Sequence, residues 1–217
     1  MLSRKKGDCM SIVIVDYGAG NVRNVIKAMA YVGLSAKLTQ NPTDILSADG
    51  IVIPGVGAFK SAMDQINDYQ LLKPIQQAAK KGIPILGVCL GMQLLFDSST
   101  EFGQTTGFGL IPGTVEQLPK NTPFKVPQMG WNQNNVSINN VMTSGIKDEY
   151  TYFVHSYYAK TEAKYIAASV DYGVIVPSLV IKDNIIGAQF HPEKSGDVGL
   201  RVWQAFATLV QEKVASS

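Results

Sequence analysis

Three short runs of isoleucine and valine most constrain how this chain can fold, because each is bounded by glycine or proline. The runs are SIVIV, GIVIP and IPILGV, which begin at residues 11, 50 and 83. Strands that are apolar on both faces are typical of a parallel sheet covered by helices on each side. The sequence therefore predicts an α/β fold with a parallel sheet in its first half.

Apolar residues recur at helical spacing between these runs. Val22, Val25, Ile26 and Met29 form one stripe that ends near Gly33, and a second stripe over residues 71–79 ends at Gly82. The first half is therefore predicted to run β-α-β-α-β.

The sequence pattern changes from about residue 102 onward, where strand-like runs alternate with turn residues. The KDN tripeptide at residues 182–184 lies between two apolar runs and predicts a hairpin, and a final helix is expected to present Leu200, Trp203, Phe206, Ala207 and Val210 on one stripe. We expect antiparallel additions to the sheet in this half.

Composition narrows the class of protein. With 217 residues we expect one domain over residues 11–217, preceded by a disordered leader or tag over residues 1–10. A net charge of +2 is too mild for nucleic-acid binding. The chain shows neither a signal peptide nor an apolar run long enough to cross a membrane, and its two cysteines favour the reducing cytoplasm.

The stretch GVCLGMQLLF, which begins at Gly87, places a cysteine where the apolar period changes from strand to helix. The pattern G-x-C-x-G is typical of a nucleophile elbow, in which Gly87 and Gly91 allow a sharp turn. A thiol at a helix N-terminus is favoured in its reactive thiolate form, and the Leu90 amide is a candidate oxyanion donor. The alternative interpretation is that Cys89 is a small buried apolar residue.

A second stretch, QFHPEKSG, supplies a candidate base. A strand over residues 185–190 is expected to lead to His191, and Glu193 then lies on the same side of an extended chain. A carboxylate there orients the imidazole, so that Cys89, His191 and Glu193 form a candidate catalytic triad.

Other roles for the histidines stay open. His155 has no carboxylate two residues away and is the weaker candidate base, while His191 alone is also compatible with a purely structural role at a strand end. A zinc site made from Cys89, both histidines and Glu193 lacks any short ligand pair, so we predict no metal and no cofactor.

The stretch IPGVGAF, which begins at Ile53, predicts a glycine-rich turn after a strand. Amides at Gly55 or Val56 are candidates for a second oxyanion donor. The same pattern also fits an ordinary turn or a weak phosphate loop, although the full dinucleotide fingerprint and a Walker lysine are absent.

Taken together, GVCLGMQ and FHPE resemble the class I (triad) glutamine amidotransferases over most of the chain. DYGAGN, PGVGAF, PQMGWN and HPEKSG are similar to one branch of that family, the glutaminase subunits of imidazole glycerol phosphate synthases in histidine biosynthesis. The resemblance implies a flavodoxin-like, three-layer fold with a mixed, mostly parallel sheet. Residues 1–9 match nothing in the family pattern.

The resemblance also implies a reaction and its site. L-glutamine would be hydrolysed to glutamate and ammonia through a thioester on Cys89, and the substrate would be held by Gly57, Gln93, Ser156 and Tyr157. The implied partner is a (β/α)8-barrel cyclase subunit in a heterodimer. Asn21, Met129, Trp131 and Lys194 are expected near that interface, the alternative being that Met129 and Trp131 fill the core and Lys194 is solvated.

Three rival functions remain. The chain could be the glutaminase of another synthase, such as those that make anthranilate, GMP or carbamoyl phosphate. It could be a noncatalytic flavodoxin-like binding module, although such a module does not need Cys89, His191 and Glu193 together. It could also be a cysteine hydrolase that acts on esters or peptides.

Overall fold

A central sheet of eight strands organises the computed structural model, which describes residues 10–18, 20–121 and 123–216. Five neighbouring strands are parallel. They are, in spatial order, β2 (Ala36–Thr39), β1 (Ile12–Val15), β3 (Gly50–Ile53), β4 (Ile85–Val88) and β14 (Ile185–Ala188). The sheet continues with the antiparallel strands β13 (Ile175–Lys182), β12 (Ile166–Asp171) and β9 (Asn135–Val136).

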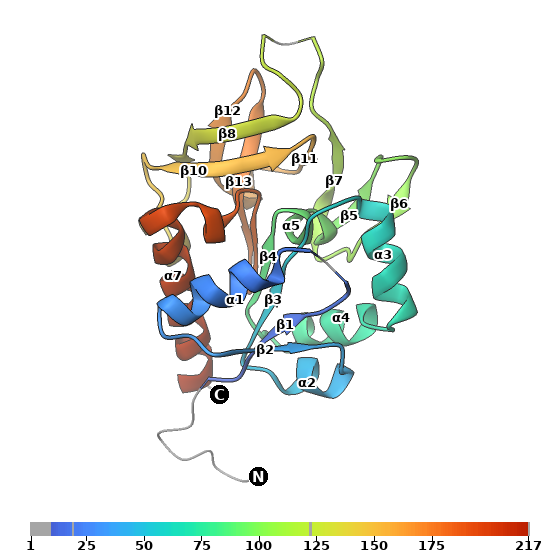
Figure 1. Ribbon diagram of the computed structural model, residues 1–217, viewed down its shortest axis with the longest axis vertical. Helices are drawn as coiled ribbons and strands as arrows, with labels where there is room; N and C mark the ends of the chain where they lie inside the picture. The colour runs from blue at the N-terminus through green and yellow to red at the C-terminus, as the bar shows by residue number, and fades with distance from the viewer. Residues whose placement is uncertain (1–9, 19, 122, 217) are drawn as a thin grey trace.

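Helices cover both faces of this sheet, as predicted (Figure 1). Because side chains alternate along a strand, Val13 and Val15 join one core cluster while Ile12 and Ile14 join the other. The first cluster packs against α2 (Pro42–Ser47), α3 (Phe59–Asp68), α4 (Leu72–Lys80) and α5 (Leu90–Leu94). The second packs against α1 (Val22–Tyr31) and α7 (Gly196–Ala215), and α7 also contacts α6 (Val141–Ser144).

Two smaller sheets are built from strands between residues 96 and 160. One has the order β11 (Tyr157–Lys160), β7 (Ile111–Gln117), β5 (Phe96–Ser99) and β6 (Thr105–Thr106). The other is a two-stranded ribbon of β8 (Gln128–Gln133) and β10 (Tyr150–His155). Two short 3₁₀ turns, η1 (Ala163–Tyr165) and η2 (Pro192–Lys194), complete the described elements.

The structure differs from the predicted elements at several points. The predicted β-α-β-α-β order lacked β2 and α2, and it had one helix where the structure has α3 and α4. Strand β2 was missed because it is an edge strand with exposed Lys37 and Leu38 and no isoleucine or valine run. The signal for α2 was present, since Asn41 caps the helix through the Thr43 amide and Pro42 occupies its first position. The hairpin between β13 and β14 is confirmed, but β14 ends at Ala188 rather than at residue 190.

The final helix is confirmed as α7. Trp203, Phe206 and Val210 are buried as predicted, whereas Leu200 and Ala207 are half-buried. The predicted leader falls mostly outside the described residues, because residues 1–9, including Cys9, are not among them; Met10 packs at the edge of the core.

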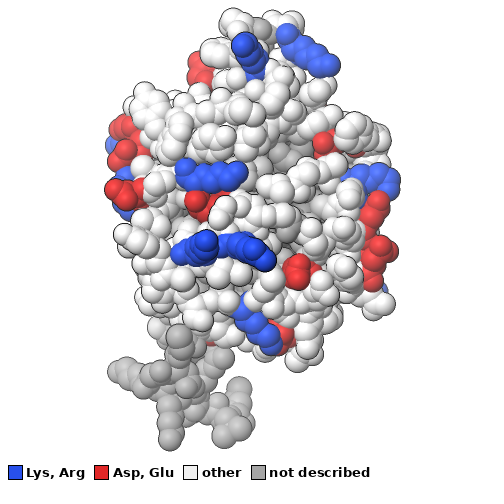
Figure 2. Space-filling view, viewed as in Figure 1, with Lys and Arg blue, Asp and Glu red and all other residues white. Residues whose placement is uncertain are grey.

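The surface carries charges of both signs. On the face drawn in Figure 2, lysine and arginine side chains lie in small groups, with acidic side chains interspersed. Within the described part of the chain, none of the helices has the length and apolar character needed to span a bilayer.

Candidate active site

The turn between β4 and α5 holds Cys89 in a strained conformation. Its backbone angles, φ 53° and ψ −110°, lie outside the regions that ordinary residues favour. The turn is tight because α5 sits directly on the end of β3, where a Cβ on Gly91 would lie 1.8 Å from the Ile53 carbonyl oxygen. A Cβ on Gly87 would likewise lie 2.5 Å from the Gly91 carbonyl oxygen. The predicted elbow and the need for both glycines are therefore confirmed.

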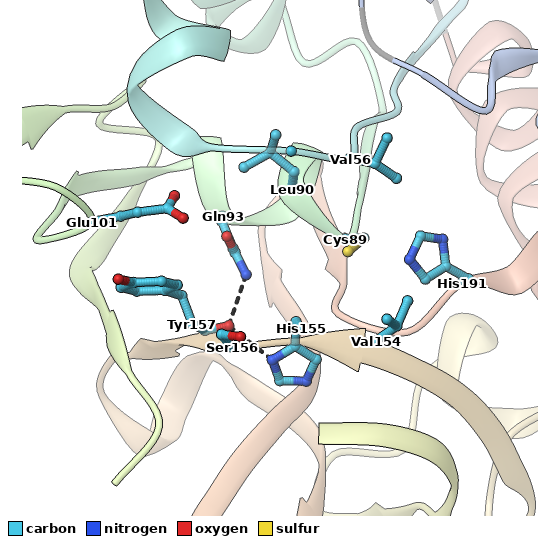
Figure 3. A pocket seen from close by; sticks show the side chains of 11 residues that line it. Val56, Cys89, Leu90, Gln93, Glu101, Val154, His155, Ser156, Tyr157 and His191 are labelled. Carbon is cyan, nitrogen blue, oxygen red and sulfur yellow. Dashed lines mark hydrogen bonds between the residues drawn. The ribbon is translucent and has the colours of Figure 1, made fainter. Parts of the chain in front are cut away.

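The sheet brings the candidate base to this elbow. Strand β14 pairs in parallel with β4, and the Cys89 amide donates to the Ala188 carbonyl at 2.8 Å. The chain then continues to His191, whose Nδ1 lies 2.8 Å from Glu193 Oε1. The side chains of His191 and Glu193 are almost completely buried, and Figure 3 shows the imidazole beside the Cys89 sulfur.

Electrostatics favour a charged His191. Burial alone would lower its pKa, but interactions with Cys89 and Glu193 outweigh burial and raise the pKa to about 9. The buried Nε2 atom makes no hydrogen bond within the described residues and so is free to exchange a proton with a neighbouring group. An imidazolium beside Cys89 stabilises the thiolate.

Glu193 has a second partner that the sequence did not reveal. The Asn21 side chain donates to Glu193 Oε1 at 2.7 Å, so this oxygen accepts bonds from both Asn21 and His191. Asn21 is half-buried and has a left-handed backbone with φ 68°. The structure therefore places Asn21 in contact with the candidate base and its carboxylate, and its expected place at or near the partner interface stays a prediction.

A cavity of about 350 Å³ opens beside Cys89, which is large enough for a small ligand. Its lining includes all four predicted substrate residues, namely Gly57, Gln93, Ser156 and Tyr157. Of the predicted oxyanion donors, Val56 and Leu90 line the cavity, whereas Gly55 lies behind it in a small hollow next to Asn21 and Glu193.

Two buried polar side chains at this site went unnoticed in the sequence. Glu101 lines the cavity and accepts the Phe59 amide at 2.7 Å through Oε2. Gln189 lies under the elbow, with its Nε2 3.9 Å from Cys89 Sγ and its Oε1 bonded to Gln93 Nε2 at 3.1 Å. A single sequence gives little sign of a buried carboxylate such as Glu101. Gln189 could have been predicted, because it lies two residues before His191.

His155 lies on the far wall of the cavity, as Figure 3 shows. Its Nδ1 bonds the Tyr157 carbonyl at 2.8 Å, and the same carbonyl accepts Gln93 Nε2 at 2.8 Å. Burial lowers the pKa of His155 to about 4, so this ring is neutral at pH 7. A neutral ring held by a backbone carbonyl fits a wall residue better than a base.

The remaining predicted interface residues lie on the β8–β10 ribbon and η2. Met129 and Trp131 are 63% and 52% exposed, so the alternative that they fill the core is wrong. Trp131 packs edge-on against Tyr152 at 6.0 Å between ring centroids, and Lys194 Nζ lies 5.7 Å from the centre of the Tyr152 ring. We call these four residues the ribbon patch.

The site shows no sign of a metal centre. Within residues 10–18, 20–121 and 123–216, no group of three or more histidine, cysteine, aspartate or glutamate side chains is placed to hold a metal ion.

Comparisons with known proteins agree with this geometry. A family model described as glutamine amidotransferase class-I matches residues 13–205. The chain is similar to imidazole glycerol phosphate synthase subunit HisH of Lacticaseibacillus casei, with 48% identity over 94% of this chain and 99% of the relative. It is 50% identical to the subunit of the same name from Lactiplantibacillus plantarum, over 94% and 98% of the two chains.

Solved structures share the fold at low sequence identity. A glutamine amidotransferase superposes with a TM-score of 0.73 and 17% identity, covering 92% of this chain and 98% of that one. A putative GMP synthase subunit from Thermoplasma acidophilum gives a TM-score of 0.70 and 18% identity, covering 97% and 99%.

Proposed function

The chain belongs to the class I glutamine amidotransferase family, and we propose that it is the glutaminase subunit of an imidazole glycerol phosphate synthase in histidine biosynthesis. The observation that carries the proposal is that Cys89 and His191 line one cavity, with Glu193 bonded to His191 Nδ1 behind it. Relatives that share 48% and 50% identity over almost the whole chain support the choice of this synthase.

The first half-reaction forms a thioester. The Cys89 thiolate attacks the side-chain amide carbon of glutamine, and the carbonyl oxygen becomes an oxyanion. Protonated His191 then gives its Nε2 proton to the amide nitrogen, so that the C–N bond breaks and ammonia leaves. Glu193, bonded to Nδ1 at 2.8 Å, holds the ring in orientation and offsets its positive charge.

The second half-reaction releases glutamate. Neutral His191 takes a proton from water, whose oxygen attacks the thioester carbon. The C–S bond breaks, the sulfur leaves as a thiolate, and His191 keeps the proton for the next cycle. Amides of Val56 and Leu90 are our candidates for stabilising the oxyanion in both steps.

Substrate recognition follows from the polar groups that the cavity leaves free. Both N–H groups of Gln93 are used within the protein, so its amide oxygen is left to accept from a ligand. Glu101 uses one carboxylate oxygen on the Phe59 amide and has the other for a cation. We assign these two acceptors to the α-ammonium group of glutamine, and the Ser156–Tyr157 backbone to its carboxylate.

The ribbon patch suits a protein partner. Exposed methionine and aromatic side chains with a single lysine are typical of interface cores. The relatives are named as subunits, and we propose that the partner is a (β/α)8-barrel cyclase subunit, which receives ammonia in a heterodimer. The cytoplasm remains a prediction from cysteine content.

The rival functions are weaker on specific grounds. A binding module does not account for a strained Cys89 beside a charged His191. A peptide or ester hydrolase does not account for a cavity with Glu101 and Gln93 positioned for an ammonium group. A different synthase would share the fold, as the putative GMP synthase subunit does at 18% identity.

The test uses Cys89→Ala in the complex with the cyclase subunit of the same organism. We expect glutamine-dependent synthesis to fall by about 10⁴-fold or more, because the nucleophile is removed. Ammonia-dependent synthesis by the cyclase is expected to stay at the wild-type rate. Cys9→Ser is the matched control and should change neither activity.

Two results would count against the proposal. Loss of the ammonia-dependent reaction in Cys89→Ala would contradict the division of labour between subunits. A stable complex of this chain with a synthase subunit that is not a barrel cyclase would mean that the ammonia goes to another acceptor, and not to imidazole glycerol phosphate synthesis.

A further inference from the structure

Tyr17 makes a buried contact with the segment that carries the candidate oxyanion donors. It lies two residues after the end of β1 and is only 1% exposed. Its hydroxyl donates to the Pro54 carbonyl oxygen at 2.5 Å. Tyr17 is not among the residues that line the cavity, so it has no contact with a ligand there.

This bond is difficult to break within the folded protein. A buried carbonyl or hydroxyl without a partner is costly, so both groups depend on the pairing. Burial, with a smaller contribution from the nearby Cys89, raises the pKa of the Tyr17 hydroxyl well above its usual range. The hydroxyl therefore remains protonated, and a donor, at every pH where the enzyme would work.

The bond fixes the orientation of one peptide group. In a trans peptide the C=O and N–H point in opposite directions, so directing the Pro54 carbonyl toward Tyr17 directs the Gly55 amide away from it. Gly55 is also closely packed, because a Cβ there would lie 2.3 Å from Tyr17 Oη and 3.0 Å from Leu90 Cβ. The Pro54–Gly55 peptide is thus enclosed between Tyr17 and the start of α5.

The next two residues have no such support. Val56 is 41% exposed, and Gly57 has φ 109°, with no atom within 4 Å of the point where a Cβ would lie. The anchored Pro54–Gly55 peptide is therefore the fixed point that directly precedes Val56, which lines the cavity.

We propose that Tyr17 is a positioning residue, whose hydroxyl anchors the Pro54–Gly55 peptide and so aligns the Val56 amide for the oxyanion. This inference rests on the proposed glutaminase function. It assigns to Tyr17 an effect on the rate of the chemical step, exerted through the backbone, and no role in binding glutamine.

The test compares Tyr17→Phe, which removes only the hydroxyl, with Tyr172→Phe. The Tyr172 hydroxyl also donates to a backbone carbonyl, that of Lys125 at 2.7 Å, and it does not line the cavity. Both variants are made in a Cys9→Ser background and assayed in the complex with the cyclase subunit. The measurements are kcat and KM for glutamine, and the rate at which iodoacetamide alkylates Cys89.

We expect Tyr17→Phe to lower kcat by about 10-fold, since misplacing an oxyanion donor slows the chemical step. KM for glutamine and the alkylation rate should stay at wild-type values, because neither depends on the oxyanion. Tyr172→Phe should match the wild type throughout. Each kcat is divided by the fraction of Cys89 that a glutamine-like diazo ketone labels, so a partly unfolded sample does not count as a slow enzyme.

Two outcomes overturn the role of Tyr17 while leaving the glutaminase function intact. In one, Tyr17→Phe has the wild-type kcat; in the other, its alkylation rate falls in step with kcat, which would place the effect at the thiol. Failure of the proposed function has a different signature, because the wild-type complex would then release no glutamate from glutamine, and both proposals would fall.

Discussion

The two backbone segments that meet at Cys89 are held in very different ways. The elbow from Gly87 to Gly91 is buried, and added Cβ atoms at its two glycines would collide with backbone atoms. The segment at Val56 and Gly57 is exposed, and a Cβ on Gly57 would meet nothing within 4 Å. Cys89 is therefore fixed by close packing, whereas the candidate oxyanion donor lies in an exposed segment between the packed Gly55 and the buried Phe59.

The two segments are therefore expected to respond differently to substitution. Close packing transmits any added volume into the fold itself. A segment without neighbours can change its backbone conformation without disturbing the core, so a substitution there is expected to alter rate more than stability. Four substitutions, two of them with a matched control, test this contrast and the groups around it.

Gly91→Ala is expected to have the largest effect. The new Cβ would lie 1.8 Å from the Ile53 carbonyl oxygen, so β3 and α5 must separate. We expect the free energy of unfolding to fall by about 3 kcal/mol, with loss of activity, because overpacking a close backbone contact strains both elements. Urea unfolding followed by circular dichroism measures this, and wild-type stability would show that the elbow is not rigid.

Gly57→Ala tests the other segment. Its φ of 109° disfavours a side chain, and we expect a loss of about 1–2 kcal/mol in stability. Glutamine turnover in the complex should fall by about 10- to 100-fold, because the backbone next to the Val56 donor must change.

Gly33→Ala is the matched control for Gly57→Ala. Gly33 also has a positive φ, 79°, and open space around it, but it follows α1 outside the cavity. It should lose similar stability and keep wild-type turnover. Equal turnover in the two variants would show that the backbone at Gly57 does not affect activity.

The pH dependence of Cys89 alkylation tests the electrostatics of the elbow. His191, with a pKa raised to about 9, is protonated at pH 7 and stabilises the thiolate. In His191→Asn the iodoacetamide rate at pH 7 should fall about 10-fold, since an unassisted thiol is only a few per cent ionised there.

The raised pKa of His191 predicts how the difference between the two alkylation rates changes with pH. Above about pH 9 wild-type His191 loses its charge, so the rates of the two proteins should converge as pH rises. The measurement uses a Cys9→Ser background, in which Cys89 is the remaining thiol. A constant ratio of rates from pH 6 to 10 would contradict the charged pair.

Asn21→Gly should have the smallest effect. Glycine accepts the left-handed backbone at φ 68°, so the change removes the bond to Glu193 Oε1 and the bond that Asn21 Oδ1 accepts from the Asn24 side chain, without straining the backbone. We expect glutamine turnover to fall about 5-fold, because Glu193 still orients His191 but is held less firmly. Gln70→Gly, another left-handed residue but on the exposed surface, is the control. A loss of complex affinity at unchanged turnover would instead return Asn21 to the partner interface.

Some of the site was predictable because its signals are local. Strand-to-helix turns need particular residue types at fixed spacing, so Cys89 with Gly87 and Gly91 was readable from five consecutive residues. The contact between His191 and Glu193 was also predicted, but the extended chain expected between them is wrong, because Pro192–Lys194 form the 3₁₀ turn η2.

Other parts were not predictable because their partners are remote in sequence. The bond from Asn21 to Glu193 and the contact of Tyr17 with Pro54 join segments that no local pattern connects. Glu101 follows β5, which lies outside the central sheet and pairs with β7, and this pairing brings it to the cavity. The exposure of Met129 and Trp131 depends on β8 pairing with β10 above the sheet rather than inside it.

Local sequence patterns identify the candidate catalytic residues, since hydrophobic period, glycine spacing and the proline after His191 act within a few residues of the chain. That these residues face one another depends on the fold of the whole chain. The pairing of β4 with β14 sets Cys89 beside the strand that leads to His191, and the packing of β3 against α5 carries Val56 to the same cavity. Such register and packing depend on burying apolar surface across the whole sheet, which no short segment encodes.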